Sequence, residues 1–150
     1  MRALIQRVER AAVVIGGQVH AAIGYGILVF VGIETGDTRE DSEWLARKIA
    51  ALRIFDDEAG VMNLSLVQAG GNTLAVSQFT LCASTQKGNR PSYVRASRGE
   101  QAIALYDDFV RALSAAIGKP VANGVFGADM QVELVNDGPV TIWIDSRRRE

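Results

Sequence analysis

The sequence predicts an α+β fold in which a mostly antiparallel, barrel-like sheet carries two main helices. Pairs of strand-like segments separate the helical ones, and tight turns join several of these pairs, which is typical of the α+β class. At 150 residues with 48% hydrophobic residues, the chain is long enough for one well-formed core and short for two. We therefore expect a single domain spanning residues 1–150.

The first half of the chain begins with a predicted antiparallel pair. Residues 2–15 and 18–23 have strand patterns on either side of the turn Gly16-Gly17. The continuous apolar run 27–33 has the length of a strand and is expected to be central and buried on both faces.

A helix is then predicted over residues 40–51, where apolar residues recur at helical spacing. Its candidate N-caps are Thr35, Asp37 and Thr38. A short strand is predicted at residues 52–55.

A β-like run follows the turn Gly70-Gly71-Asn72 and extends from Thr73 to Leu81. Strand alternation would place polar side chains on both of its faces at the end, where Ser77, Gln78 and Thr80 lie. Three hydrogen-bonding side chains within four residues need partners or a ligand. The alternative is a strand that simply becomes exposed towards its end.

The pattern of residues in the last third of the chain predicts a helix and a hairpin. An apolar stripe runs from residue 100 to 117, with Gly118 as C-cap and Pro120 beyond it. Residues 130–135 alternate like a strand, the run 136–139 (Asn-Asp-Gly-Pro) has the composition of a turn, and residues 140–144 would return as the last strand.

Composition excludes several classes of protein. A net charge of −1 and a pI near 5.9 argue against a broad basic surface for duplex nucleic acid. Cys82 is the single cysteine, no stretch has the length of a membrane span, and no signal-peptide pattern is present, which favours a cytoplasmic protein. With one cysteine and one histidine, a Cys/His zinc site is excluded, and no motif indicates another metal or a cofactor.

The usual catalytic sets are also missing. The only histidine, His20, lies on an early strand of mixed polarity and is expected to be a solvated residue rather than the base of a Ser-His-Asp triad. Cys82 has no neighbouring base and is expected to be buried and inert. The glycines form neither a phosphate loop nor a dinucleotide fingerprint.

Seven short motifs nevertheless stand in an order and spacing that resemble one known family: MRALIQRV, LRIFDD, MNLSL, SQFTL, KGNRPS, FGADM and NDGPVT. The family is that of the D-aminoacyl-tRNA deacylases, or D-tyrosyl-tRNA deacylases, and the resemblance covers essentially the whole chain. It implies hydrolysis of the ester between a D-amino acid and tRNA, activity on glycyl-tRNA, and a homodimer that works without a metal or other cofactor on the aminoacyl-tRNA acceptor end.

The resemblance also implies roles for individual residues. The catalytic set would be Ser77, Gln78, Phe79 and Thr80, with the backbone N–H groups of Phe79 and Thr80 facing the ester carbonyl. A cis peptide at Gly138-Pro139 would enter the partner's pocket as a chiral gate. Adenosine or substrate contacts would come from Phe126, Met130 and Thr141. Apart from the resemblance, the basic residues near this site are candidate tRNA phosphate contacts, each of which is alternatively a solvated charge: Lys87, Arg90, Arg95 and Arg98.

Such a gate would work by exclusion. Carbonyl oxygens turned to one side leave no room for an L side chain, whereas glycine, which lacks a side chain, would pass. Backbone N–H groups would stabilise the oxyanion and the ribose 2′-OH would assist. The competing mechanism makes the Thr80 hydroxyl a nucleophile, although no base in the sequence activates it.

Three positions depart from the family pattern. Cys82 stands where a tyrosine commonly follows SQFTL, and Val61 stands where a lysine often precedes MNLSL. Asn123 stands where the glycine before FGADM often has a threonine partner. These departures put affinity more in doubt than reaction type. Two readings from other classes remain: a non-catalytic module that binds the tRNA end, and a purely structural homodimer.

Overall fold

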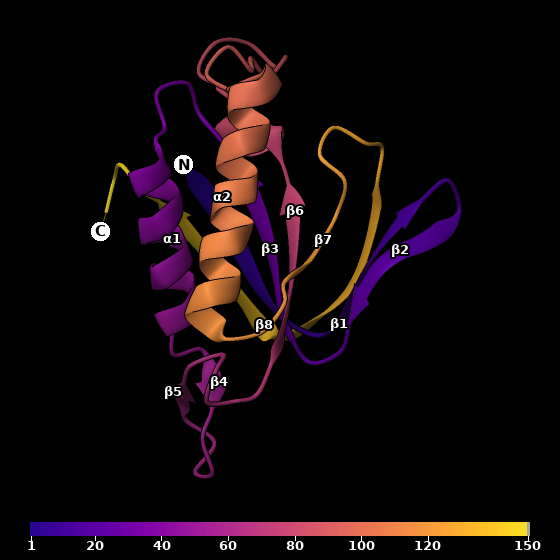
Figure 1. Ribbon diagram of the computed structural model, residues 1–150, viewed down its shortest axis with the longest axis vertical. Coiled ribbons are helices and arrows are strands. Elements are labelled where there is room, and N and C mark those ends of the chain that lie inside the picture. Colours follow the sequence, from indigo (N-terminus) through magenta and orange to yellow (C-terminus); the bar gives the residue numbers. More distant parts are fainter. Residues whose placement is uncertain (150) are drawn as a thin grey trace.

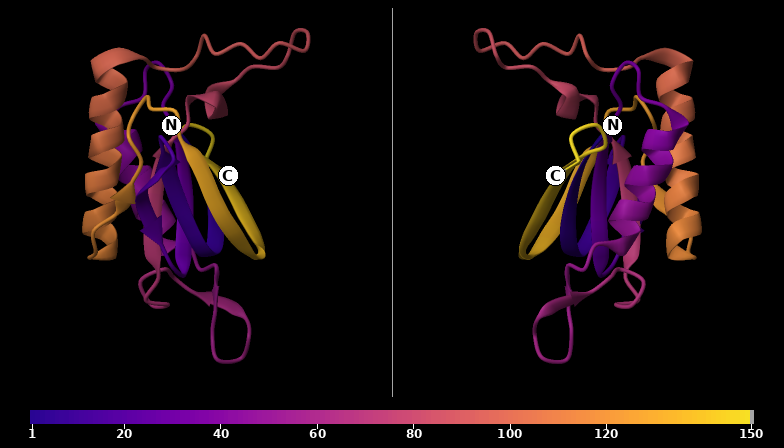
Figure 2. Two further views of the ribbon diagram at one scale, coloured as in Figure 1. Left: turned by 90° about the vertical axis from the view of Figure 1, so that its right-hand side faces the viewer. Right: turned by 90° about the vertical axis from the view of Figure 1, so that its left-hand side faces the viewer.

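Two helices cover one face of a curved sheet in the computed structural model, which describes residues 1–149 (Figures 1 and 2). The helices are α1 (Arg39–Ala51) and α2 (Gly99–Ile117), and a 3-10 turn, η1, spans Phe79–Cys82. The strands are β1 (Arg2–Ile15), β2 (Gln18–Ile23), β3 (Gly26–Gly32), β4 (Phe55–Asp56), β5 (Met62–Leu64), β6 (Asn72–Ser77), β7 (Ala122–Asn123) and β8 (Gln131–Asp145). The expected α+β architecture is confirmed.

Strand β1 organises the main sheet. It pairs antiparallel with β2, β3 and β8, and the strand order β2-β1-β3-β6-β7 continues from it. The β3–β6 and β6–β7 pairs are parallel, so the sheet is mixed within its mainly antiparallel pattern. The parallel step from β3 to β6 needs a long crossover, which contains α1.

The curvature of the sheet creates two cores. One lies between the sheet and the helices and includes Ile5, Val29, Leu45 and Phe109. The other lies inside the curl and includes Val8, Leu28, Leu74 and Val76. Strand β3 contributes alternate residues to both, which explains its continuous apolar sequence. The prediction that it is central and buried is confirmed.

The helix boundaries follow local signals. Thr38 is the N-cap of α1, and the Asp41 carboxylate accepts its backbone N–H at 2.9 Å in a capping box. Gly118 ends α2 in the left-handed conformation with φ of 68°, and its N–H donates to the Ser114 carbonyl at 3.0 Å. Both helices begin one residue before the predicted start. No helix in residues 1–149 is long and apolar enough to cross a membrane.

Two strand predictions were wrong at their ends. The segment predicted as a strand at 52–55 is mostly connection, because Leu52 is the C-cap of α1 and β4 covers only Phe55–Asp56. The run predicted to continue to Leu81 leaves the sheet after Ser77 and forms η1. The polar residues there occupy a turn rather than two faces of a strand.

The predicted hairpin at residues 136–139 was also wrong. Strand β8 runs past these residues in one direction along β1, pairing Asn136 with Val8 and Thr141 with Gln6. Residues 137–140 therefore form a bulge opposite Arg7. The Arg7 Nε pairs with the Asp137 carboxylate at 2.9 Å, and Asn136 Nδ2 donates to the Arg7 carbonyl at 3.3 Å. These contacts hold the two halves of β8 in line.

Candidate functional site

A cavity of about 510 Å³ opens where β6 ends. Three segments surround it: the end of β6 with the start of η1, the residues leading into α2, and the loop before β8. Its apolar floor includes Val31, Ile33 and Val76, and its polar rim includes Ser77, Gln78, Ser97, Arg98 and Asp129. No cluster of metal-ligating side chains occurs in the described part of the chain. The cavity therefore offers an apolar surface with a few polar groups, as small-molecule sites do.

The backbone of η1 provides hydrogen-bond donors beside this cavity. Gln78 N–H donates to the Val31 carbonyl at 2.7 Å, and Leu81 N–H donates to the Gln78 carbonyl at 3.2 Å. Between them, the N–H groups of Phe79 and Thr80 donate to no acceptor within residues 1–149. The first N–H groups of any helical turn lack partners of their own. Two neighbouring donors are thus free for an oxygen of a bound molecule.

Close packing fixes the position of η1 against β3. A Cβ on Gly32 would lie 2.9 Å from Leu81 Cβ and 3.0 Å from both Cys82 Sγ and the Gln78 carbonyl oxygen. Only glycine permits so close an approach. The Cys82 thiol is buried, which raises its pKa to about 11, and it donates to the Ile33 carbonyl at 3.5 Å. The expectation of a buried thiol is confirmed.

The side chains of the turn pair with each other. Gln78 Nε2 donates to the Thr80 hydroxyl oxygen at 2.6 Å. No carboxylate, histidine or lysine in residues 1–149 hydrogen-bonds that hydroxyl, and Thr80 is not among the residues lining the cavity. His20 is exposed on β2, as expected of a solvated residue. The arrangement supplies Thr80 with an amide partner and no base.

Two of the three residues expected to bind the adenosine line the cavity. Phe126 packs against Tyr106 with 5.9 Å between ring centroids, and Met130 lies over Gly124, where a Cβ would be 2.6 Å from its sulfur. Thr141 lies elsewhere: it is exposed on β8 and accepts a hydrogen bond from Gln6 Nε2 at 3.2 Å. The structure therefore does not bring Thr141 to the cavity of its own chain.

The four basic residues expected to contact phosphate divide into two groups. Arg98 lines the cavity, and Arg95 donates to the Ala83 carbonyl at 3.3 Å beside it. Lys87 and Arg90 are exposed on the long loop between η1 and α2, which projects away from the helices (Figure 2). The loop thus carries two free-standing positive charges beyond the cavity rim.

The segment Gly138-Pro139 lies near the opposite end of the β1–β3 ladder. Its peptide bond is cis, as the resemblance implied, and both residues are exposed on the bulge of β8. The bulge faces the Val8–Gly26 end of the β1–β3 ladder, whereas η1 packs at Gly32. Six strand residues separate these ends by about 20 Å. Within one chain, the expected gate does not reach the cavity.

Other residues of the site were not among those predicted from the sequence. Ser97 lines the cavity and belongs to none of the seven motifs, and Asp129 lines it as part of FGADM, although no role was predicted for its side chain. Arg7 supports the bulge through Asp137 and donates to the Ile54 carbonyl at 2.8 Å. Arg7 belongs to the opening motif MRALIQRV, and its place in that motif was the available signal in the sequence.

Known proteins match the chain along its length. A family model described as D-Tyr-tRNA(Tyr) deacylase matches residues 4–145. The D-aminoacyl-tRNA deacylases of Chromobacterium violaceum and Porphyromonas gingivalis are 64% and 60% identical over 150 residues, covering 100% of both chains in each case.

Two solved structures share the fold of this chain. One described as c-Myc DNA Unwinding Element Binding Protein has a TM-score of 0.92 at 43% identity and covers 97% of this chain and 98% of its own. A probable eukaryotic D-amino acid tRNA deacylase shares the fold, with a TM-score of 0.81 at 18% identity over 95% of this chain and 97% of its own. The chain therefore belongs to the D-Tyr-tRNA(Tyr) deacylase family, whose members are the D-aminoacyl-tRNA deacylases.

Proposed function

We propose that this chain hydrolyses the ester bond of D-aminoacyl-tRNA with backbone groups of η1 as its catalytic donors. The terminal adenosine would occupy the cavity between Phe126 and Met130, and the ester carbonyl would face the N–H groups of Phe79 and Thr80. The observation that carries this proposal is a pair of adjacent N–H groups that have no acceptor within residues 1–149: that of Phe79, which lines the cavity, and that of Thr80, the residue after it.

The chemistry needs little more than these donors. Water attacks the ester carbonyl, the C–O bond to the ribose breaks, and free amino acid and tRNA result. Negative charge develops on the carbonyl oxygen in the transition state, and one well-placed donor to such an oxygen is worth about 2.7–4 kcal/mol in other enzymes. The neighbouring 2′-OH of the ribose would assist the proton transfer. A protein base is then unnecessary.

Selection against L-amino acids would come from a second copy of the chain. Gly138-Pro139 is exposed and about 20 Å from the cavity of its own chain, so only a partner's copy can close that cavity. The sheet face away from the helices carries half-buried Leu4 and Phe30 and exposed Trp143, an apolar surface suited to a homodimer. The gate would reject an L side chain sterically, and glycyl-tRNA would remain a substrate.

The deciding experiment compares D-tyrosyl-tRNA, L-tyrosyl-tRNA and glycyl-tRNA under single-turnover conditions with purified protein. Rapid loss of the D ester and the glycyl ester, with the L ester intact, is the expected result. Equal cleavage of the D and L esters would contradict the gate. Binding of tRNA without any cleavage would identify a non-catalytic module instead.

The Thr80 hydroxyl is the competing catalytic group. Because its hydrogen-bond partner is the Gln78 amide and not a base, we expect Thr80→Ala to retain at least about a third of the wild-type single-turnover rate. The control is Thr38→Ala, which changes a threonine at the N-cap of α1 and outside the cavity. Loss of more than about a hundredfold with an unchanged melting temperature would instead support an acyl-enzyme route.

The exposed loop is the expected contact for the tRNA backbone. Replacing both Lys87 and Arg90 with alanine should weaken tRNA binding and reduce the slope of log K against log[salt] by about 1.4–1.8, since each lost phosphate contact accounts for about 0.7–0.9. Binding assays between 50 and 200 mM salt would measure this slope. An unchanged slope would place the phosphate contacts elsewhere.

A further inference from the structure

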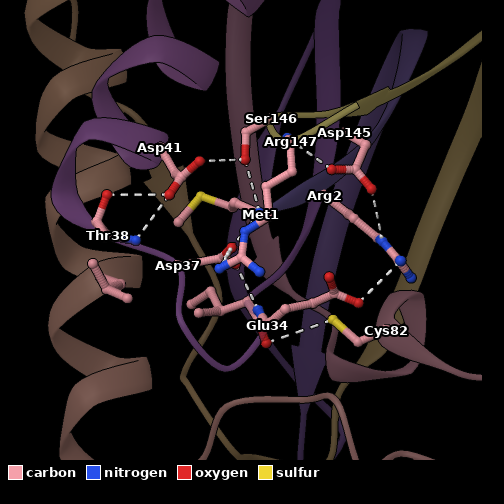
Figure 3. Close-up of polar contacts among 12 residues, drawn as sticks. Met1, Arg2, Glu34, Asp37, Thr38, Asp41, Cys82, Asp145, Ser146 and Arg147 are labelled. Carbon is pink, nitrogen blue, oxygen red and sulfur yellow. Dashed lines mark hydrogen bonds and ion pairs between the residues drawn. The ribbon is translucent and has the colours of Figure 1, made fainter. Parts of the chain in front are cut away.

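The amino terminus lies in a buried network of charges next to η1 (Figure 3). The α-ammonium of Met1 pairs with the Asp37 carboxylate at 2.7 Å and donates to the Ser146 hydroxyl at 2.8 Å. Met1 and the Asp37 side chain are completely buried. A charged group away from water is stable only with such partners, so the position of Met1 is closely fixed.

The next residue, Arg2, uses all three guanidinium nitrogens. Its Nη1 donates to the Leu81 carbonyl in η1 at 2.9 Å, its Nη2 pairs with Glu34 at 3.0 Å, and its Nε pairs with Asp145 at 3.2 Å. Only 11% of the side chain is exposed. Arg2 is therefore the one side chain among residues 1–149 that hydrogen-bonds a backbone carbonyl of η1.

The two carboxylates around Arg2 are themselves fixed. Glu34 N–H donates to the Asp37 carboxylate at 2.6 Å, which joins Glu34 to the Met1 ammonium. Arg147 N–H donates to the Asp145 carboxylate at 2.9 Å. Contacts thus run without interruption from the α-ammonium through Asp37 and Glu34 to Arg2 (Figure 3). From Arg2 the hydrogen bond to Leu81 leads to the turn that carries the proposed donors.

We propose that Arg2 is a positioning residue for deacylation, held in place by the charged amino terminus. Its hydrogen bond to Leu81 prevents η1 from rotating, and so keeps the N–H groups of Phe79 and Thr80 directed at the ester carbonyl. This inference rests on the proposed function of those two groups. Arg2 does not line the cavity, so it acts through the backbone and not on the substrate.

Lysine cannot replace arginine in this role. A guanidinium presents donors in a rigid planar fork, whereas an ammonium is a single charged point on a flexible stem. Arg2→Lys keeps the charge balance with Glu34 and Asp145 but cannot also hold the Leu81 carbonyl. The variant therefore tests the geometry of η1 separately from the charge of the network.

The experiment measures kcat and KM of Arg2→Lys on D-tyrosyl-tRNA, with Arg39→Lys as the matched control. Arg39 is exposed on α1, and among residues 1–149 it pairs only with Glu43. A misplacement of about 1 Å costs up to about a hundredfold in rate, so we expect kcat of Arg2→Lys to fall about 10- to 100-fold while KM changes less than about twofold. The control should match the wild type.

A second readout separates positioning from folding. The amide NMR signals of Phe79 and Thr80 should shift or broaden in Arg2→Lys, while those of α1 and α2 stay unchanged. If Arg2→Lys does not fold, Glu34→Gln replaces it, because this variant retains an acceptor for Arg2 but loosens its position. For Glu34→Gln we expect a smaller fall in kcat, about threefold.

The inference would be overturned if folded Arg2→Lys had the kcat of the wild type. It would also be overturned if the loss of activity were fully explained by the fraction of unfolded protein. These results differ from failure of the proposed function. If wild-type protein does not cleave D-tyrosyl-tRNA, the proposed function fails. If the wild type and Arg2→Lys cleave it equally, the donors are retained and only the role of Arg2 is excluded.

Discussion

The two ends of the β1–β3 ladder each carry a largely buried arginine of β1, but the two side chains support different parts of the site. Arg2 has its guanidinium between Glu34 and Asp145, both about 10% exposed, and holds η1 of its own chain. Arg7 pairs with Asp137 and Asp56, which are 30% and 47% exposed, and holds the exposed bulge. The end at the cavity is closed and rigid, and the end at the bulge is open to solvent or to a partner.

Because of this difference, we expect the two arginines to affect different properties of the enzyme: the rate of deacylation and the preference for D over L esters. Arg2 and Arg7 lie five residues apart, so their side chains point to opposite faces of the sheet. Changes near Arg2 should alter turnover of the D ester and spare the preference for D over L. Changes near Arg7 should alter that preference and spare turnover of the D ester.

The largest effect is expected from extending the chain by Gly-Ser before Met1. The extension removes the α-ammonium from the buried Asp37 carboxylate, which keeps the Arg147 guanidinium at 3.1 Å. Breaking a buried ion pair costs about 3–5 kcal/mol in the free energy of unfolding when the remaining charge has no partner, and because Arg147 remains we expect a loss at the lower end, about 3 kcal/mol. Urea titration measures the loss. In an Asp37→Asn background the same extension should cost much less, and an equal cost in both backgrounds would contradict this explanation.

A smaller effect on stability, but the largest on selectivity, is expected from Gly138→Ala. An added Cβ would lie 2.7 Å from Val140 Cγ2 and 2.8 Å from the Val140 nitrogen, at a φ of 122° that L residues rarely adopt. We expect a loss of about 1–3 kcal/mol and a fall of about tenfold or more in the ratio of D to L cleavage rates. Gly24→Ala is the control, since a Cβ there meets nothing within 4 Å. An unchanged ratio of D to L cleavage rates would show that the bulge has no part in chiral selection.

The third change, Arg7→Lys, tests the open end directly. Lysine retains one charge but not the simultaneous contacts to Ile54 and Asp137, so the bulge should loosen. We expect about 1–2 kcal/mol of destabilisation and a fall of about threefold in the D/L ratio, with kcat for the D ester unchanged. If kcat falls while the D/L ratio stays constant, the two ends of the β1–β3 ladder do not divide rate and selectivity between them.

The smallest effect concerns acid stability at the closed end. Burial alone would raise the pKa of Asp145, but the N–H of Arg147 and the Arg2 guanidinium outweigh it, so the pKa lies below its usual value. Its contribution to stability is therefore complete above about pH 4 and is lost as the pH falls through the lowered pKa. Asp145→Asn should unfold with a shallower pH dependence below pH 4, measured by chemical denaturation between pH 5 and pH 2. Parallel curves for the two proteins would contradict this assignment.

Local patterns predicted the elements that depend on local interactions. The capping residues of α1 and α2 and the Gly16-Gly17 turn act within a few residues, and these elements were predicted within a residue or so of their observed ends. Residues 136–139 have the composition of a turn, yet Arg7 and Asn136 keep β8 running straight. That outcome depends on contacts across more than 100 residues, which turn propensity does not include.

The site was predicted in part for the same reason. Among the residues that the family motifs predict for the site, one cavity is lined by Ser77, Gln78, Phe79, Phe126 and Met130. The motifs placed Thr141 in the same set, although it lies on the exposed face of β8. The network around the amino terminus left no pattern in the sequence, because an α-ammonium is present in every chain and only folding brings Asp37 and Ser146 to it.

The shared strand also limits how the sequence can diverge. Residues 2–7 are the spacer between the two arginines, and side chains alternate along it. Removing or adding one residue there would reverse the face of every side chain on one side of the change and shorten or lengthen the span by about 3.3 Å. Many substitutions within this spacer are compatible with the fold, but its length is not free to change.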